Sequence, residues 1–118
     1  MAPQFQVVAV GYIVDTPFTY WCAAAPNGIQ PVTKAQILSG GHYVLTFNPS
    51  AFQGSIFVFV TTTGMVGPAG TRSMATVPYT DVNRCEIICT TSPAIVKPTN
   101  LNFLIVEAYG PFPSIDAI

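Results

Sequence analysis

Three cysteines are the residues of this sequence best suited to metal or redox chemistry: Cys22, Cys85 and Cys89. The last two fall on one face of a predicted strand, four residues apart, which places their Cα atoms about 13 Å apart. A disulfide needs about 5.5 Å and a shared tetrahedral zinc needs similar closeness, so both are excluded for this pair. A bridge from Cys22 to either one stays open. An odd number of cysteines without an export signal favours buried free thiols.

His42 is the only histidine, and it directly follows Gly41 at the start of a predicted strand. A cysteine–histidine nucleophile would need a thiol from another strand, and no recognised motif surrounds any of the cysteines. Glu86 and Arg84 share one face of their strand, where they can form an ion pair. The sequence has no dinucleotide-binding, Walker, nucleophile-elbow or zinc-protease motif. We therefore predict no catalytic site, cofactor or metal; an enzyme that uses Cys22 or Cys89 is the remaining alternative.

Aromatic side chains could form a sugar-stacking platform, as they do in carbohydrate-binding modules. The residues considered are Tyr12, Tyr20, Trp21, Tyr43, Tyr79 and Tyr109. In a small β-domain most such side chains belong to the core. Tyr20 and Trp21 are the pair that we single out as a candidate ligand surface, because they lie close to the turn Pro26-Asn27-Gly28.

Composition limits which elements can position these residues. A chain of 118 residues forms one domain that buries roughly two thirds of its extended surface on folding. Half of the residues are apolar but only 8% are charged, against about 25% in an average soluble domain. The net charge of −1 excludes a basic nucleic-acid surface, and no apolar stretch reaches the roughly 20 residues of a membrane span. So little charge predicts exposed apolar side chains, and hence an oligomer or a larger assembly.

Eleven prolines and nine glycines leave no helical window of a dozen residues, and β-branched and aromatic residues fill the intervals between them. About eight strands at this spacing predict an all-β fold, an antiparallel, jelly-roll-like β-sandwich that occupies residues 1–110 as a single domain. Gly11 inside the first strand marks a bulge or a close backbone contact. The predicted strands cover residues 5–14, 18–25, 29–38, 42–47, 55–62, 72–79, 83–91 and 101–109.

The fifth predicted strand is apolar on both faces. Ile56, Val58 and Val60 face one way, and Phe57 and Phe59 face the other. Such a strand needs cover on both sides, for which a second sheet and a neighbouring subunit are candidates. We therefore assign Phe57 and Phe59 to a subunit contact.

The C-terminal residues 111–118 cannot continue a central strand, because two prolines remove backbone donors. Phe112, Ile115 and Ile118 are nevertheless apolar. The segment is therefore either an extended arm that lays these three side chains on a neighbour, or a frayed terminus.

Four segments together resemble the small β-sandwich heads of phage fibres and related virion-surface proteins. They are Gly41–Phe47, Phe57–Val60, Cys85–Thr91 and Asn102–Val106, and the resemblance extends over about residues 7–110. It implies a homotrimer whose inner sheets pack around a threefold axis, which would cover the two-faced strand. No individual binding residue transfers with it, because such proteins share a scaffold and not a site.

No shaft, coiled coil or collagen-like repeat precedes the first predicted strand. We therefore expect a non-enzymatic virion structural protein, namely a trimeric decoration or cement protein that binds the major capsid protein or another virion protein of a phage. It would be made in the host cytoplasm and act at the virion surface, without nucleic-acid binding or membrane insertion. The alternative is a receptor- or carbohydrate-binding fibre head, an adhesin that uses Tyr20 and Trp21.

Overall fold

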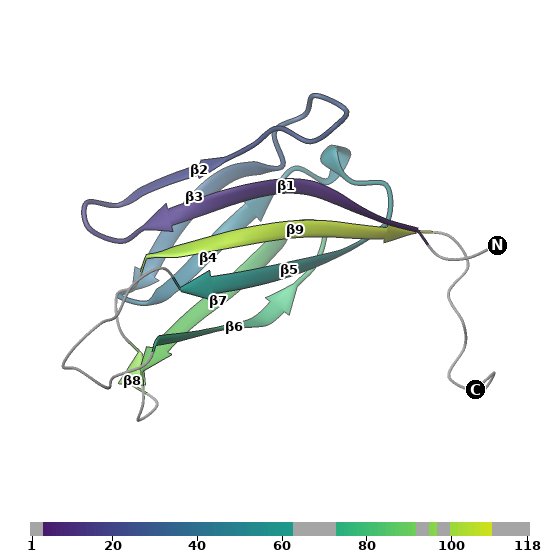
Figure 1. The fold of residues 1–118 in the computed structure, drawn as a ribbon. Coiled ribbons are helices and arrows are strands. Elements are labelled where there is room, and N and C mark those ends of the chain that lie inside the picture. The colour runs from purple at the N-terminus through teal and green to yellow at the C-terminus, as the bar shows by residue number, and fades with distance from the viewer. Residues whose placement is uncertain (1–3, 63–72, 92–94, 97–99, 110–118) are drawn as a thin grey trace, which may run out of the picture.

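The computed structural model describes residues 4–62, 73–91, 95–96 and 100–109. Its strands form two antiparallel sheets that pack face to face (Figure 1). Sheet A has the order β2-β1-β9-β5, with β2 at Thr19–Cys22, β1 at Gln4–Val14, β9 at Leu101–Tyr109 and β5 at Ser55–Thr62. The first long strand therefore pairs with the last. The all-β antiparallel sandwich predicted from the sequence is confirmed.

Sheet B is the second layer. It has the order β3-β4-β7-β6, and the short β8 also pairs with β7. Its strands are β3 (Val32–Ser39), β4 (His42–Phe47), β6 (Ser73–Thr80), β7 (Arg84–Thr91) and β8 (Ile95–Val96). A short 3-10 helix, η1 (Pro49–Ala51), connects β4 to β5. Asn48 caps it by accepting a hydrogen bond of 3.0 Å from the Ser50 backbone N–H.

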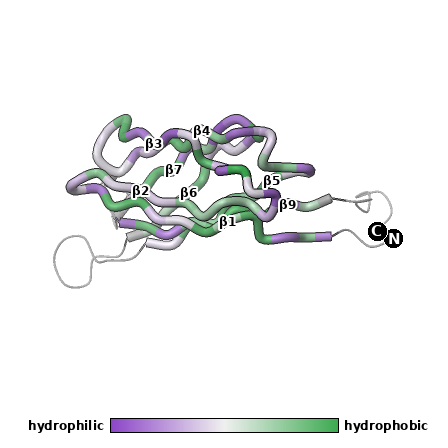
Figure 2. Tube along the Cα trace, turned by 90° about the horizontal axis from the view of Figure 1, so that it is seen from above, coloured by the Kyte–Doolittle hydropathy of each residue, from purple (hydrophilic) through white to green (hydrophobic). Residues whose placement is uncertain are grey.

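The core lies between the two sheets, where alternate residues of each strand point inward. Ile13 and Ile105 enter it from sheet A, and Tyr43, Leu45 and Ile87 enter it from sheet B, all with no measurable exposure. Figure 2 views the molecule from above, with β3, β4 and β7 of sheet B in the upper layer and β1, β2 and β9 of sheet A in the lower layer. This layer between the sheets covers one face of sheet A and one face of sheet B.

Two of the strands predicted from the sequence are shorter in the structure, and the short β8 is not among those predicted. The strand predicted over residues 18–25 is limited to Thr19–Cys22, and the one predicted from residue 29 starts at Val32. The cause is the turn at Pro26-Asn27-Gly28. There the Asn27 side chain accepts a hydrogen bond from the Ile29 N–H, and Gly28 adopts a φ of 85°. The turn uses the neighbouring backbone groups locally and so shortens both flanking strands.

Gly11 provides a close backbone contact and not a bulge. The register of β1 against β9 shifts between Val7 and Ala9, which leaves Gly11 in regular pairing. A Cβ atom on Gly11 would lie 2.3 Å from Cζ of Phe103 and 2.4 Å from the carbonyl oxygen of Trp21. Both distances are far below van der Waals contact, so only glycine allows the Phe103 ring to pack under β1.

Predicted segment 111–118, with Phe112, Ile115 and Ile118, lies outside the described residues.

We predict that Gly11→Ala destabilises the protein by about 1–3 kcal/mol, the usual cost of overpacking a core. The new methyl group cannot be accommodated by the ring alone, because the Trp21 carbonyl belongs to the backbone. Urea unfolding measures the change. Gly28→Ala is the control: nothing lies within 4 Å of its Cβ position, so only strain of about 1 kcal/mol at its positive φ is expected. A Gly11→Ala variant as stable as the wild type would contradict this packing.

Candidate functional site

The side of sheet A that faces away from sheet B, here called outer face A, is built from side chains in register across the strands. Its residues alternate along each strand with those that enter the core. Three rows cross β1, β9 and β5, and a fourth begins on β2. In order, the rows are Phe5, Ala108 and Ser55; Val7, Val106 and Phe57; Val10, Leu104 and Phe59; and Trp21, Tyr12, Asn102 and Thr61.

Outer face A exposes large apolar side chains to an unusual extent. Phe5, Phe59 and Trp21 are 67%, 58% and 49% exposed. If a fully exposed aromatic side chain presents about 200 Å², the five aromatic residues of the face together expose about 500 Å². The aliphatic residues add to this total. The face therefore reaches the upper end of the 300–600 Å² or so that the largest apolar patch of a monomer normally spans.

No charged side chain of the described residues points outward from sheet A. The one acidic residue of β9, Glu107, points inward and is 5% exposed. Its carboxylate accepts a hydrogen bond of 2.7 Å from the Gln53 backbone N–H, which ties the segment after η1 to the sheet. A buried carboxylate with a backbone partner has a structural role here.

The outer face of sheet B differs in carrying charged side chains, although Met74 on the same face is 58% exposed. His42 Nε2 lies 3.3 Å from one carboxylate oxygen of Glu86, and a guanidinium nitrogen of Arg84 lies 3.9 Å from the other. The same guanidinium lies 4.6 Å from the ring centre of Tyr79. This arrangement confirms that Arg84 and Glu86 share a face and form an ion pair. The outer face of sheet B therefore carries charged side chains, whereas outer face A carries none among the described residues.

Phe57 and Phe59, which the sequence assigns to a subunit contact, both lie on outer face A. Their neighbours Ile56, Val58 and Val60 point toward the core, so the two-faced character of β5 is confirmed. The assignment of these two phenylalanines to a subunit contact stays a prediction.

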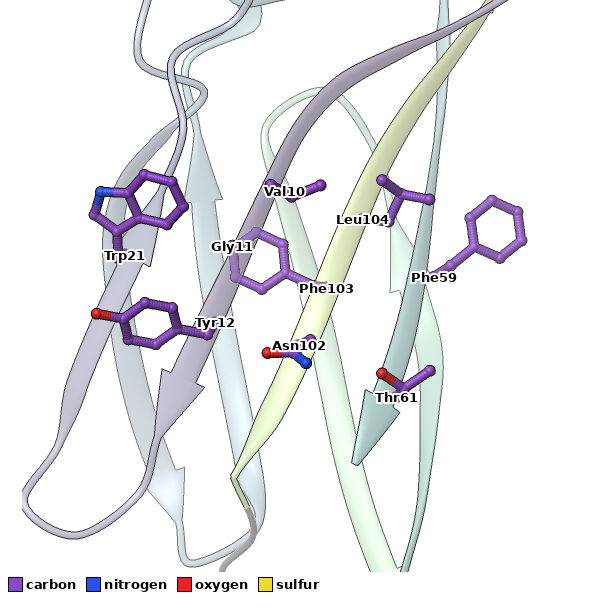
Figure 3. Close-up of a pocket in the computed structure, with 9 residues that line it drawn as sticks. All are labelled: Val10, Gly11, Tyr12, Trp21, Phe59, Thr61, Asn102, Phe103 and Leu104. Carbon is purple, nitrogen blue, oxygen red and sulfur yellow. The ribbon is translucent and has the colours of Figure 1, made fainter. Parts of the chain in front are cut away.

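An open cavity of about 490 Å³ lies on outer face A (Figure 3). Tyr12 and Trp21 lie side by side at one end of it, with ring centres 6.0 Å apart and planes inclined by 25°. Phe59 lies at the other end, and the polar side chains of Asn102 and Thr61 lie between them. Stacked rings beside an amide and a hydroxyl form a surface that can bind a flat, partly polar ligand.

Tyr20 and Trp21 both line a second open cavity, of about 610 Å³, but on different sides of β2. They are consecutive residues of β2, so their side chains leave opposite faces of the strand. The Tyr20 ring instead lies 6.3 Å from that of Phe18, while Trp21 packs against Tyr12. Tyr12, Asn102 and Thr61 complete the Trp21 surface, and the sequence alone does not identify them because only the strand register brings them beside Trp21.

The three cysteines are buried free thiols. Cys85 and Cys89 point into the core from β7, whereas His42 lies on the outer face of sheet B. Burial raises the pKa of each of the three thiols to about 11. The described residues contain no group of three or more metal-binding side chains. The described thiols are therefore protonated near neutral pH and separated from the histidine by the sheet.

No helix in the described part of the chain is long and apolar enough to cross a membrane. Comparisons with protein-family models, with curated proteins and with solved structures each found no match.

We predict that the thiols react with Ellman's reagent only after unfolding. A pKa raised from 9.0 to about 11 lowers the thiolate fraction at pH 8 by about 100-fold, and burial slows the reagent further. The reaction rate of the folded protein is compared with that of the protein in urea, in which all three cysteines should react. One thiol that reacts at the rate of a free cysteine in the folded protein would contradict the buried positions.

Proposed function

We propose that this protein is a non-enzymatic structural protein that assembles with copies of itself through outer face A. The observation that carries the proposal is the combination of exposed aromatic side chains with the lack of outward charge on the described residues of sheet A. A monomer that kept this face in water would forgo the free energy of burying it.

The free energy gained by burying outer face A exceeds the free-energy cost of association. Burying about 500 Å² of apolar surface contributes about 12 kcal/mol per copy at 25 cal/mol per Å². Two copies contribute twice that amount, against an association cost of about 4–15 kcal/mol. A standard interface buries about 800 Å² per partner, which the aromatic and aliphatic residues of outer face A approach.

We further propose that the assembly is a homotrimer that decorates the surface of a virion, with the major capsid protein or another virion protein as its partner. This part rests on the resemblance of Gly41–Phe47, Phe57–Val60 and the later strands to virion-surface heads. In such a trimer, outer face A turns toward the threefold axis. The His42–Glu86 contact and the Arg84–Glu86 ion pair then stay in contact with water.

A second candidate function is carbohydrate binding, as in the receptor-binding head of a fibre. The observation in its favour is the Tyr12–Trp21 ring pair, which shares a cavity with Asn102 and Thr61. The rings would stack on the apolar face of a sugar, and the amide and hydroxyl would bind its hydroxyl groups.

We predict that Phe59→Asp converts the assembly into single chains of 12.6 kDa. The new carboxylate would have to be desolvated in the contact, at a cost of several kcal/mol. Light scattering coupled to size exclusion measures the mass, which for the wild type should correspond to a multiple of three chains. Gln36→Asp adds the same charge to the exposed outer face of sheet B and should leave the mass unchanged.

Labelled wild-type protein should also sediment with emptied phage capsids, and Phe59→Asp should sediment less. A wild type that is monomeric at every concentration would contradict the assembly proposal. An assembled protein that leaves capsids untouched would contradict only its virion part.

For the second candidate, we predict that Trp21→Ala abolishes binding on a glycan array whereas Tyr20→Ala preserves it, because the two side chains leave opposite faces of β2. Circular dichroism controls for folding. An array that stays silent with folded wild-type protein would rule this candidate out.

A further inference from the structure

The cavity of outer face A has exposed aromatic rings at both of its ends. Tyr12 and Trp21 line one end, on β1 and β2, and are 39% and 49% exposed. Phe59 lies at the other end, on β5, and is 58% exposed. Both ends therefore keep much of their ring surface accessible in a single copy.

Phe59 cannot fill the aromatic end of this cavity within its own chain. β2 and β5 are the first and last strands of sheet A, three strand spacings or about 14 Å apart. The Phe59 ring also points away from the Tyr12–Trp21 pair (Figure 3). A ring that covers this pair must therefore come from another molecule.

The position of β5 in the sandwich determines what a neighbouring molecule can contact there. β6 of sheet B lies beside β5 (Figure 1). A neighbour therefore meets the side chains of outer face A and not the backbone of β5. Because Phe59 is 58% exposed, its ring is open to such a contact even though β6 lies close by.

The cavity suits a phenylalanine ring in size and in chemistry. A cavity of about 150 Å³ is enough to hold one benzene molecule, and this open cavity has about 490 Å³. No charged side chain of the described residues lines it, so a ring can enter without desolvating a charge. Two aromatic rings that stack or meet edge to face are stabilised beyond the area that they bury.

We infer that the Phe59 ring of one copy occupies the Tyr12–Trp21 end of the cavity on a second copy. This inference rests on the proposed self-assembly and specifies its contact. The ring and the aromatic end lie at opposite edges of one face, so each copy inserts one ring and receives another. Three copies around a threefold axis then close into a ring in which every Phe59 and every cavity is used.

The ring contact supplies a defined part of the interface. If a fully exposed aromatic side chain presents about 200 Å², then Phe59, Tyr12 and Trp21 together expose about 290 Å². This is about a third of the roughly 800 Å² that each partner buries in a standard interface. The other apolar side chains of outer face A continue on either side of the contact and extend the buried area.

A double-mutant cycle tests the contact. Phe59→Leu and Trp21→Leu each remove a ring and keep an apolar side chain. Sedimentation measures the dissociation constant of the assembly for the wild type, both single variants and the double variant. If the rings touch across copies, the double variant should lose less affinity than the two single losses combined, by about 2- to 12-fold per contact. Substitutions more than about 7–10 Å apart act independently within one chain, so the coupling would arise between copies.

Phe5→Leu is the matched control. Phe5 lies on the same face of β1, at the other end of the strand from Tyr12, and is 67% exposed. Combined with Trp21→Leu, it should change the dissociation constant additively. Circular dichroism confirms the folding of these variants.

Mixing two charged variants tests that different parts of the face meet. Phe59→Asp lacks the ring and keeps the cavity, whereas Trp21→Asp keeps the ring and disrupts the cavity, so each alone should give single chains. Their mixture should give pairs with one chain of each, because Phe59 of one enters the intact cavity of the other. The double variant Trp21→Asp/Phe59→Asp has no ring to insert and should not pair with Phe59→Asp. Light scattering gives the masses.

The outcomes separate this inference from the assembly proposal. A wild type that assembles while Phe59→Leu and Trp21→Leu act additively would overturn the ring contact and leave assembly through outer face A intact. Pairing of both mixtures, the control included, would also overturn it. Coupling confined to Phe59 and Trp21 supports the contact, as does pairing of the first mixture alone. A wild type that is monomeric at every concentration would overturn both proposals.

Discussion

Sheet A is apolar on both faces, and the fold supplies a second layer for only one of them. The inner face packs against sheet B through Ile13 and Ile105, which are fully buried. The outer face has the same chemistry and lacks that cover within the described residues, so Phe5 and Phe59 remain more than half exposed. The presence of two apolar faces with a second layer over only one of them accounts for the high apolar fraction of the sequence. A chain that is half apolar has more apolar side chains than a single sandwich core of this size can bury.

The distribution of charge follows from the same constraint. Sheet B faces water on its outer side, and the ion pair of Arg84 with Glu86 lies there. On sheet A, the acidic residue of β9 is turned inward, where Glu107 holds the segment after η1. The cysteines fit this division as well, since Cys85 and Cys89 serve as small apolar residues of the core. The two outer faces thus differ in chemistry: charged side chains lie on that of sheet B, and none of the described residues places a charge on outer face A.

Local patterns in the sequence predict the strands and the two-faced character of β5, because alternation has a period of two and needs no knowledge of partners. They do not predict which strands become neighbours. Tyr12 meets Trp21 only through the β1–β2 register, and Asn102 joins them only because β9 pairs with β1. The bulge at Val8 and the packing of Phe103 under Gly11 likewise depend on the partner strand. Of the candidate surface, Phe57, Phe59 and Trp21 could therefore be predicted from the sequence, whereas the residues that the strand register brings beside them could not.

The central claim is that outer face A is covered in the assembled protein. Trp21 is the only tryptophan of the chain, lies on that face and is 49% exposed in a single copy. Acrylamide quenching of its fluorescence across a dilution series therefore measures the cover directly. The account predicts that quenching falls and the emission maximum moves to shorter wavelength as concentration rises through the range of assembly. A Trp21 that is quenched equally at all concentrations, in a protein that assembles, would contradict it.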